Sequence, residues 1–157
     1  MTDNLRIRKA TPADGKMLFE WRNDEETRRA SGTTAPLEWD AHVKWFEKVL
    51  SGGFRGRMLY IVETQMEDPV GTVRSDVRDD GFTEVSYTVS PKWRGKGMGK
   101  QMVIQFAQEF LAGHKIAARI KKGSNLASEA IARALGLHPF SETPADDPHE
   151  PPMIEWR

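Results

Sequence analysis

The stretch SPKWRGKGMGK, residues 90–100, decides the fold of this chain. It follows a strand-like run, Phe82–Val89, and precedes a run whose apolar residues recur at helical spacing from Met102 to Leu111. Glycine admits positive φ and lets a ligand approach the backbone closely, and the free N–H groups and dipole of a helix start favour negative charge. The stretch therefore predicts an anion-binding turn between a strand and a helix.

The spacing of the glycines excludes three common phosphate-binding loops. A Rossmann fingerprint needs a third glycine where Lys100 stands, and no βαβ unit precedes the stretch. A Walker A loop needs four residues between its glycines and a Ser or Thr after its lysine, but three residues separate Gly95 from Gly99, and Gln101 follows Lys100. A protein-kinase glycine loop fails at the same third glycine.

The pattern that remains is Arg-x-x-Gly-x-Gly, filled by Arg94, Gly97 and Gly99. A second segment lies downstream, from Asn125-Leu126-Ala127-Ser128 to Leu135-Gly136-Leu137. Together with the order of elements over the chain, these segments resemble the GCN5-related N-acetyltransferase (GNAT) superfamily. The resemblance implies that acetyl-coenzyme A is the co-substrate and that the glycine stretch wraps its pyrophosphate. A glycine turn that serves only as a helix entry is the alternative.

The length of 157 residues predicts a single domain, residues 1–157, and the order of the periodic segments predicts the α+β class. We expect a mostly antiparallel mixed sheet with helices on both faces, as in the GNAT fold. A capping box at Thr11-Pro12-Ala13-Asp14 predicts that the first helix begins there. The expected strands are 5–8, 58–64, 69–76, 82–89, 116–120 and 153–156, and the expected helices run from 12 to about 26, 39 to about 50, 102–111 and 126–135, with an acidic, proline-rich loop over 141–152.

Composition narrows the classes of function. Lys plus Arg and Asp plus Glu both number 23, so the zero net charge gives no sign of nucleic acid or an anionic membrane as partner. The absence of cysteine excludes disulfides, thiolate nucleophiles and cysteine metal sites, and four widely spaced histidines form no metal-binding pair, so we expect no metal. The first residues lack the pattern of a secretory signal, which predicts a cytoplasmic protein.

The resemblance assigns the cofactor contacts. It implies that the fourth strand splays from the fifth, that the pantetheine chain lies in the gap, and that the Val89 N–H group donates to the acetyl carbonyl. The residues expected at the pyrophosphate are Arg94, Gly95, Lys96, Gly97, Met98, Gly99 and Lys100, and Asn125 and Ser128 of the second motif are expected to contact the cofactor. The cations Lys92, Arg94, Lys96 and Lys100 suit a ligand with several phosphates, although a solvated helix entry is the alternative.

The proton-transfer groups are less clear from the sequence. Strand alternation places Glu84 on the face opposite Tyr87, where its carboxylate could act as the base or form an ion pair with Arg74 or Arg78. The family's frequent general acid is a tyrosine seven residues after the motif asparagine, and that position holds Ala132. Tyr60, Tyr87 or a water could replace this phenol, or the thiol could leave as thiolate. A packed strand aromatic is the alternative for Tyr87.

The expected acceptor site lies on the first two helices and the third strand. Trp21-Arg22-Asn23, His42 and Arg74 resemble the branch that acetylates nucleotide-linked amino sugars, and share part of their pattern with ribosomal-protein N-terminal acetyltransferases. Aromatic rings suit a sugar or base, and Arg22 and Arg28 offer forks for a diphosphate. Helical aromatics that only fill the core are the alternative.

The leading hypothesis is thus an acetyl-coenzyme A-dependent N-acetyltransferase of a nucleotide-linked amino sugar. The alternatives are acetylation of a protein N-terminus or a small amine, and a coenzyme A-binding module without catalysis. The family often forms dimers, so a homodimer is expected, although no stretch of this chain predicts an interface.

Overall fold

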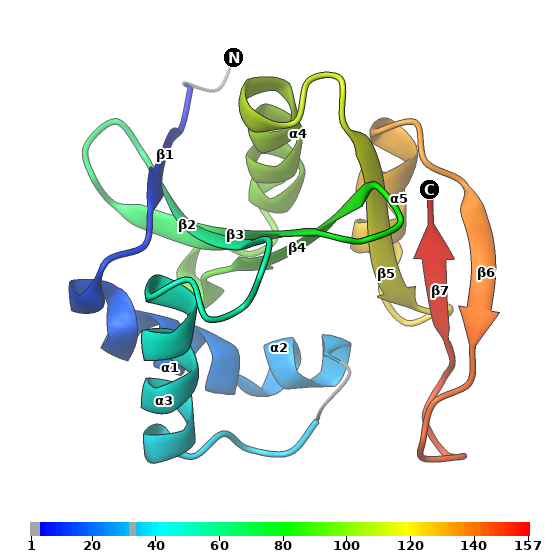
Figure 1. Ribbon diagram of the computed structural model, residues 1–157, viewed down its shortest axis with the longest axis horizontal. Coiled ribbons are helices and arrows are strands. Elements are labelled where there is room, and N and C mark those ends of the chain that lie inside the picture. The colour runs from blue at the N-terminus through cyan, green and yellow to red at the C-terminus, as the bar shows by residue number, and fades with distance from the viewer. Residues whose placement is uncertain (1–3, 32–33) are drawn as a thin grey trace.

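The computed structural model describes residues 4–31 and 34–157. Residues 1–3, on which part of the localisation prediction rests, lie outside this range. Within it, the strands form one sheet in the order β1-β2-β3-β4-β5-β7-β6, and every neighbouring pair is antiparallel except β4 and β5 (Figure 1). The strand bounds are β1 Arg6–Lys9, β2 Arg57–Glu63, β3 Pro69–Val77, β4 Phe82–Val89, β5 Lys115–Lys121, β6 Pro139–Thr143 and β7 Met153–Trp156. The predicted mostly antiparallel α+β sheet is confirmed.

Helices cover both faces of the sheet, as expected (Figure 1). One face carries α1 (Gly15–Asn23), α2 (Glu25–Ala30) and α3 (Trp39–Leu50), and the other carries α4 (Met98–Phe110) and α5 (Leu126–Ala134). Because side chains alternate along a strand, β2 supplies both layers. Its Leu59 and Ile61 pack with α1 and α3, whereas Tyr60 and Val62 pack with α4. No helix among the described residues is long and apolar enough to cross a bilayer.

The first helix differs from its prediction in one respect. The capping box of Thr11 and Asp14 is present, but Pro12–Asp14 forms a 3₁₀ turn before α1 begins. The expected single helix to about residue 26 is interrupted at Asp24, whose carboxylate accepts the N–H of Thr27 at 3.1 Å and caps α2. A side-chain acceptor for an N–H group at a new helix start favours this break over continuation.

The strand β6 was not expected. All five of its residues are exposed, so no alternation of apolar and polar residues marks it in the sequence. It forms because β7 offers an edge, with Glu142 opposite Ile154 and Thr143 opposite Met153. The strand predicted at 153–156 is confirmed as β7, and β6 takes the first residues of the predicted loop.

Candidate active site

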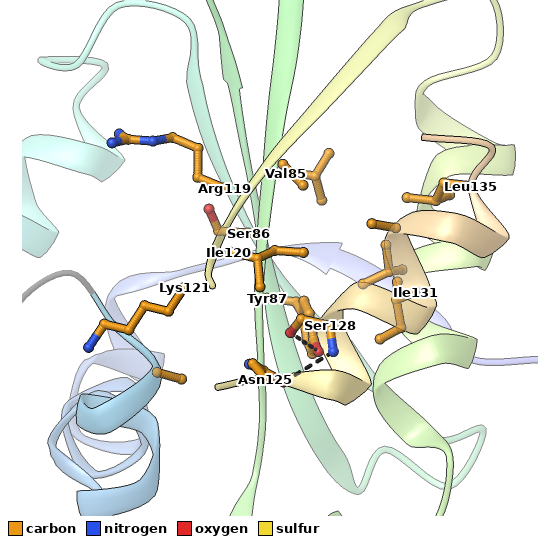
Figure 2. A pocket seen from close by; sticks show the side chains of 14 residues that line it. Val85, Ser86, Tyr87, Arg119, Ile120, Lys121, Asn125, Ser128, Ile131 and Leu135 are labelled. Atoms are coloured by element: carbon orange, nitrogen blue, oxygen red, sulfur yellow. Dashed lines mark hydrogen bonds between the residues drawn. The ribbon is translucent and has the colours of Figure 1, made fainter. Parts of the chain in front are cut away.

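The parallel strands β4 and β5 are paired only at their beginnings. Three residue pairs join them, from Phe82 with Lys115 to Glu84 with Ala117, and no pairing follows from Val85 onward. A cavity of about 110 Å³ fills the resulting gap, with Ser86 and Tyr87 of β4 on one side and Ile120 of β5 on the other (Figure 2). The two strands therefore part as the family resemblance implied.

The gap adjoins a larger cleft of about 1050 Å³. Tyr87, Asn125 and Ile131 line both spaces, so the narrow gap opens into the cleft. The walls of the cleft come from the end of β4, the glycine stretch, the start of α5 and α2; they include Thr88, Val89, Trp93, Arg94, Gly95, Gly97, Met98, Gly99, Lys100 and Ser124. An elongated ligand can thus lie from the start of α4 to the interior of the sheet.

The glycine stretch has the backbone shape that an anion site requires. Gly95 and Gly97 adopt φ of 72° and 73°, and α4 begins at Met98 directly after them. The first N–H groups of a helix have no partner inside the helix, so this end of α4 presents donors to the cleft. The side chain of Met98 lies in the core, which leaves only its backbone for the ligand. These residues fit a pyrophosphate.

Arg94 is held by α2. Its Nη2 donates to the Asp24 carboxylate and, at 3.0 Å, to Thr27 Oγ1, while its Nε lies 3.0 Å from Glu26 Oε2. The Arg94 guanidinium holds the pKa of the Asp24 carboxyl below its usual value. Arg94 therefore ties the glycine stretch to α2 across the cleft, and its contact with a phosphate stays a prediction.

The three lysines of the stretch differ in their surroundings. Lys92 lies 3.3 Å from Asp68 and Lys96 lies over the Trp93 ring, 5.1 Å from its centre. Lys100 lines the cleft. Of the predicted cations, Lys100 is thus the lysine best placed for a phosphate charge.

The second motif organises the inner end of the cleft. Asn125 Oδ1 accepts the N–H of Ser128 at 3.1 Å and caps α5. The hydroxyl of Ser128 is 2.7 Å from the Tyr87 hydroxyl, and this hydrogen bond lies in the gap (Figure 2). Burial raises the pKa of the Tyr87 phenol. Ala132, where the family places its tyrosine, also lines the gap, so Tyr87 supplies a phenol from the facing strand.

Glu84 forms the ion pair that the sequence left open. Arg78 Nη1 donates to its Oε1 at 3.3 Å, and the same guanidinium binds Glu155 and Asp80. Glu84 is opposite Asp76 on β3 and Ala117 on β5, at the end of the paired part of β4. A role of Glu84 as base therefore stays a prediction, and its partner is Arg78, not Arg74.

Two of the side chains predicted for the acceptor site are buried. Trp21 is 7% exposed and packs in the core with Leu18 and Phe46, while His42 is 2% exposed, and a direct contact of either with the acceptor stays a prediction. Both residues follow the alternative reading, because their helical spacing turns them inward. Asn23 uses its side-chain oxygen to accept the N–H of Leu37 at 2.8 Å, which anchors the segment after α2.

Arg22 and Arg74 come together, joined by Arg57, which sequence reasoning missed. Arg57 Nε lies 2.6 Å and Arg74 Nε 2.9 Å from the carboxylate oxygens of Asp76. Burial, and then the charges of Arg74 and Arg57, lower the pKa of Arg22 to about 10. The pairing of β2 with β3, which sets Arg57 opposite Asp76, could not be read from the sequence without the register. No group of three or more His, Asp or Glu side chains among the described residues could hold a metal ion.

A sheet that parts beside a glycine-rich helix start defines a site for an elongated ligand with an anionic end. The family model described as acetyltransferase (GNAT) domain matches residues 4–138, and the chain belongs to this family, whose co-substrate is acetyl-coenzyme A. The chain is thus a GNAT acetyltransferase, as its motifs predicted. No curated protein sequence gives a significant match.

Solved structures of low sequence identity share the fold. The spermidine N-acetyltransferase from Vibrio cholerae, in complex with CoA and spermine, has a TM-score of 0.81 at 13% identity over 98% of this chain and 95% of its own. The ribosomal-protein-alanine N-acetyltransferase from Brucella melitensis has a TM-score of 0.75 at 20% identity, covering 96% and 97%. A phosphinothricin acetyltransferase from Sinorhizobium meliloti in complex with acetyl-CoA has a TM-score of 0.75 at 20% identity, covering 98% and 87%.

Proposed function

We propose that this protein transfers the acetyl group of acetyl-coenzyme A to a primary amine in the gap between β4 and β5. The observation that carries the proposal is the continuity of that gap with the glycine-rich cleft at the start of α4. The three solved relatives are described as acting on spermidine, ribosomal-protein alanine and phosphinothricin. The acceptor suggested by the sequence, a nucleotide-linked amino sugar, is tested beside these three.

The backbone of β4 supplies the donor for the acetyl carbonyl. Ser90 N–H donates to Val70 O of β3 at 2.8 Å. Because successive N–H groups of a strand point to opposite edges, the N–H of Val89 points toward the gap, where β5 has diverged. A backbone N–H fixed at the carbonyl oxygen stabilises the negative charge that develops when the amine attacks. This supports Val89 in the role that the motif suggested.

Tyr87 is the residue we assign as general acid. The amine nitrogen forms a bond to the thioester carbon, the carbon–sulfur bond breaks, and the departing thiolate takes a proton while the amine loses one. The Tyr87 phenol, whose pKa burial raises above its ordinary value, carries its proton at neutral pH and lies in the gap. Its hydrogen bond with Ser128 Oγ holds the ring in place. Glu84, directly or through water, is the candidate base.

Release of coenzyme A thiol from a panel of amines tests the proposal. The panel holds UDP-amino sugars, an N-terminal alanine peptide, spermidine and phosphinothricin. Tyr87→Phe should lower kcat by about 10²- to 10⁴-fold, the usual contribution of a general acid. The matched control is Tyr60→Phe, because Tyr60 packs on Phe106 in the core under α4. Equal rates for wild type and Tyr87→Phe would remove Tyr87 from the reaction.

The same assay separates the enzyme from a binding module. Binding of acetyl-coenzyme A, measured by calorimetry, with no thiol release above blank for any amine would refute catalysis. The chain would then be a coenzyme A-binding module without catalysis, the alternative given by the sequence. Thiol release with any amine of the panel identifies the acceptor class.

A further inference from the structure

Arg22, in the last turn of α1, is a half-buried cation. Its guanidinium carbon lies 3.8 Å from the centre of the Trp45 ring, and its Nη1 lies 2.9 Å from His42 Nδ1. Among the described residues, no Asp or Glu forms an ion pair with it, in contrast to Arg57, Arg74 and Arg78. A guanidinium carries five donors, and His42 takes one of them.

The orientation of this guanidinium is fixed by a chain of hydrogen bonds. His42 Nε2 lies 2.8 Å from the carbonyl oxygen of Gly15, which can only accept, so Nε2 carries the proton. Arg22 can only donate, so Nδ1 of the neutral ring must accept from it. The Phe46 ring stacks on His42, with the two ring centres 6.0 Å apart. The fork of Arg22 is thus held before any ligand arrives.

The charges around Arg22 have a positive excess. Arg57 and Arg74 share the single carboxylate of Asp76, so the cluster of Arg22, Arg57 and Arg74 has three guanidinium groups against one carboxylate. Burial, and then the charges of these two neighbours, lower the pKa of Arg22 to about 10. A partly desolvated cation beside like charges is unfavourable unless an anion completes the site. The cluster therefore favours an anionic ligand.

The cluster also lies beside the gap. Arg74 on β3 is directly opposite Ser86 on β4, and Ser86 lines the gap cavity. Neighbouring strands are about 4.8 Å apart, so the cluster begins one strand from the cavity. An acceptor with its amine in the gap can therefore place a second group at the arginines. Carboxylate and phosphoryl or phosphinyl oxygens match the planar fork of Arg.

We propose that Arg22, supported by Arg74, binds an anionic group of the acceptor, so that this enzyme selects amines that carry a carboxylate or a phosphorus oxyanion over polyamines. The inference rests on the proposed acetyl transfer, because it defines the acceptor of that same site. His42 acts as a positioning residue through Arg22, and Trp45 supports the face of the guanidinium.

Matched acceptors test the selection. Each set consists of an amino acid, the carboxamide of that amino acid and the amine that remains after its decarboxylation. Phosphinothricin, a UDP-amino sugar and spermidine are assayed beside these sets. We expect the carboxylate or phosphinate member of a set to have the highest kcat/KM, and Arg22→Gln to lower that value about 10- to 100-fold, the range for a charged hydrogen bond, mainly through KM. For the carboxamides and the decarboxylated amines, Arg22→Gln should change kcat/KM little. Arg6→Gln is the control, since Arg6 lies on the edge strand β1 and forms an ion pair with Glu67.

A binding measurement keeps the inference separate from the proposed function. Glutarate and methylphosphonate, titrated by calorimetry into the protein saturated with coenzyme A, probe the anion site without turnover and distinguish carboxylate from phosphoryl recognition. Binding of either probe that Arg22→Gln abolishes supports the site even if no amine is acetylated. Faster turnover of spermidine than of every anionic amine, or probe binding unchanged in Arg22→Gln or absent from wild type, would overturn it. Should Arg22→Gln fail to fold, Arg74→Gln takes its place.

Discussion

Mild acidification should destabilise the protein through His42. His42 is 2% exposed, and burial, aided by the nearby charge of Arg22, lowers its pKa against the raising effect of the Gly15 carbonyl. Protonation of Nδ1 would replace an acceptor by a donor at 2.9 Å from the Arg22 guanidinium. The charged ring therefore loses a hydrogen bond and gains a like charge.

The magnitude follows from linkage. Because the folded-state pKa lies below the unfolded value of about 6.5, the unfolded chain binds the extra proton first, and the stabilisation is complete above that pH and lost as the pH falls toward the folded pKa. If the folded ring stays neutral, the free energy of unfolding falls by about 1.4 kcal/mol between pH 7.5 and 5.5. The carboxyl groups of Asp24 and Glu155, whose pKa values are lowered by Arg94 and Arg78, act only at lower pH.

Urea denaturation at pH 7.5, 6.5 and 5.5 measures this loss. His42→Gln should be less stable at pH 7.5 and should lose the decrease between pH 7.5 and 5.5, whereas His138→Gln, at an exposed position, should keep it. If the wild type and His42→Gln have the same dependence on pH, the buried neutral ring is refuted. Since His42 orients Arg22, His42→Gln should also raise KM for an anionic acceptor and leave KM for acetyl-coenzyme A unchanged.

The glycine stretch and its tie to α2 give three further predictions. Gly97→Ala, at φ of 73° with no atom within 4 Å of an added Cβ, should lower the free energy of unfolding by about 1–2 kcal/mol through backbone strain alone, and an unchanged urea midpoint would contradict this. Gly99→Ala places a methyl group 3.0 Å from Tyr87 Cε2, so kcat should fall as the ring moves; full activity would show that Tyr87 tolerates the shift. Asp24→Ala removes the cap of α2 and the partner of Arg94, so it should lower the free energy of unfolding by about 0.5–2 kcal/mol and raise KM for acetyl-coenzyme A. An equal rise of that KM in Arg94→Gln would show that the contact between α2 and the glycine stretch supports cofactor binding. An unchanged KM in both variants would argue against this role.

Much of the fold could be predicted because local chemistry and global architecture agree. The strand Phe82–Val89 has the bounds expected from its alternation, and α5 begins at Leu126 after the cap that Asn125 provides. Gly136, at φ of 83°, follows the end of α5 as the sequence suggested. In these segments the neighbours along the chain determine the structure, so periodicity and capping residues are sufficient evidence.

Other features depend on contacts distant in sequence. The strand β6 has no apolar face and exists through its register with β7. Likewise, the break at Asp24 is reinforced by Arg94, which lies seventy residues away in the chain and contacts the same carboxylate. Arg57 joins the arginine cluster only because β2 and β3 set it opposite Asp76. No pattern within a short window of sequence contains these pairings.

The hydrogen-bond partners of each polar residue separate the site candidates that the sequence could not rank. His42 has two ring nitrogens and both are used inside the protein, so it can position but not bind. Arg94 shares its guanidinium among groups of α2, and Glu84 has its partner in Arg78. Arg22 differs, because it uses one of five donors and has no carboxylate partner among the described residues. The donors that Arg22 keeps after folding therefore support its proposed role in acceptor recognition, whereas the sequence alone could not show which polar side chains would keep such capacity.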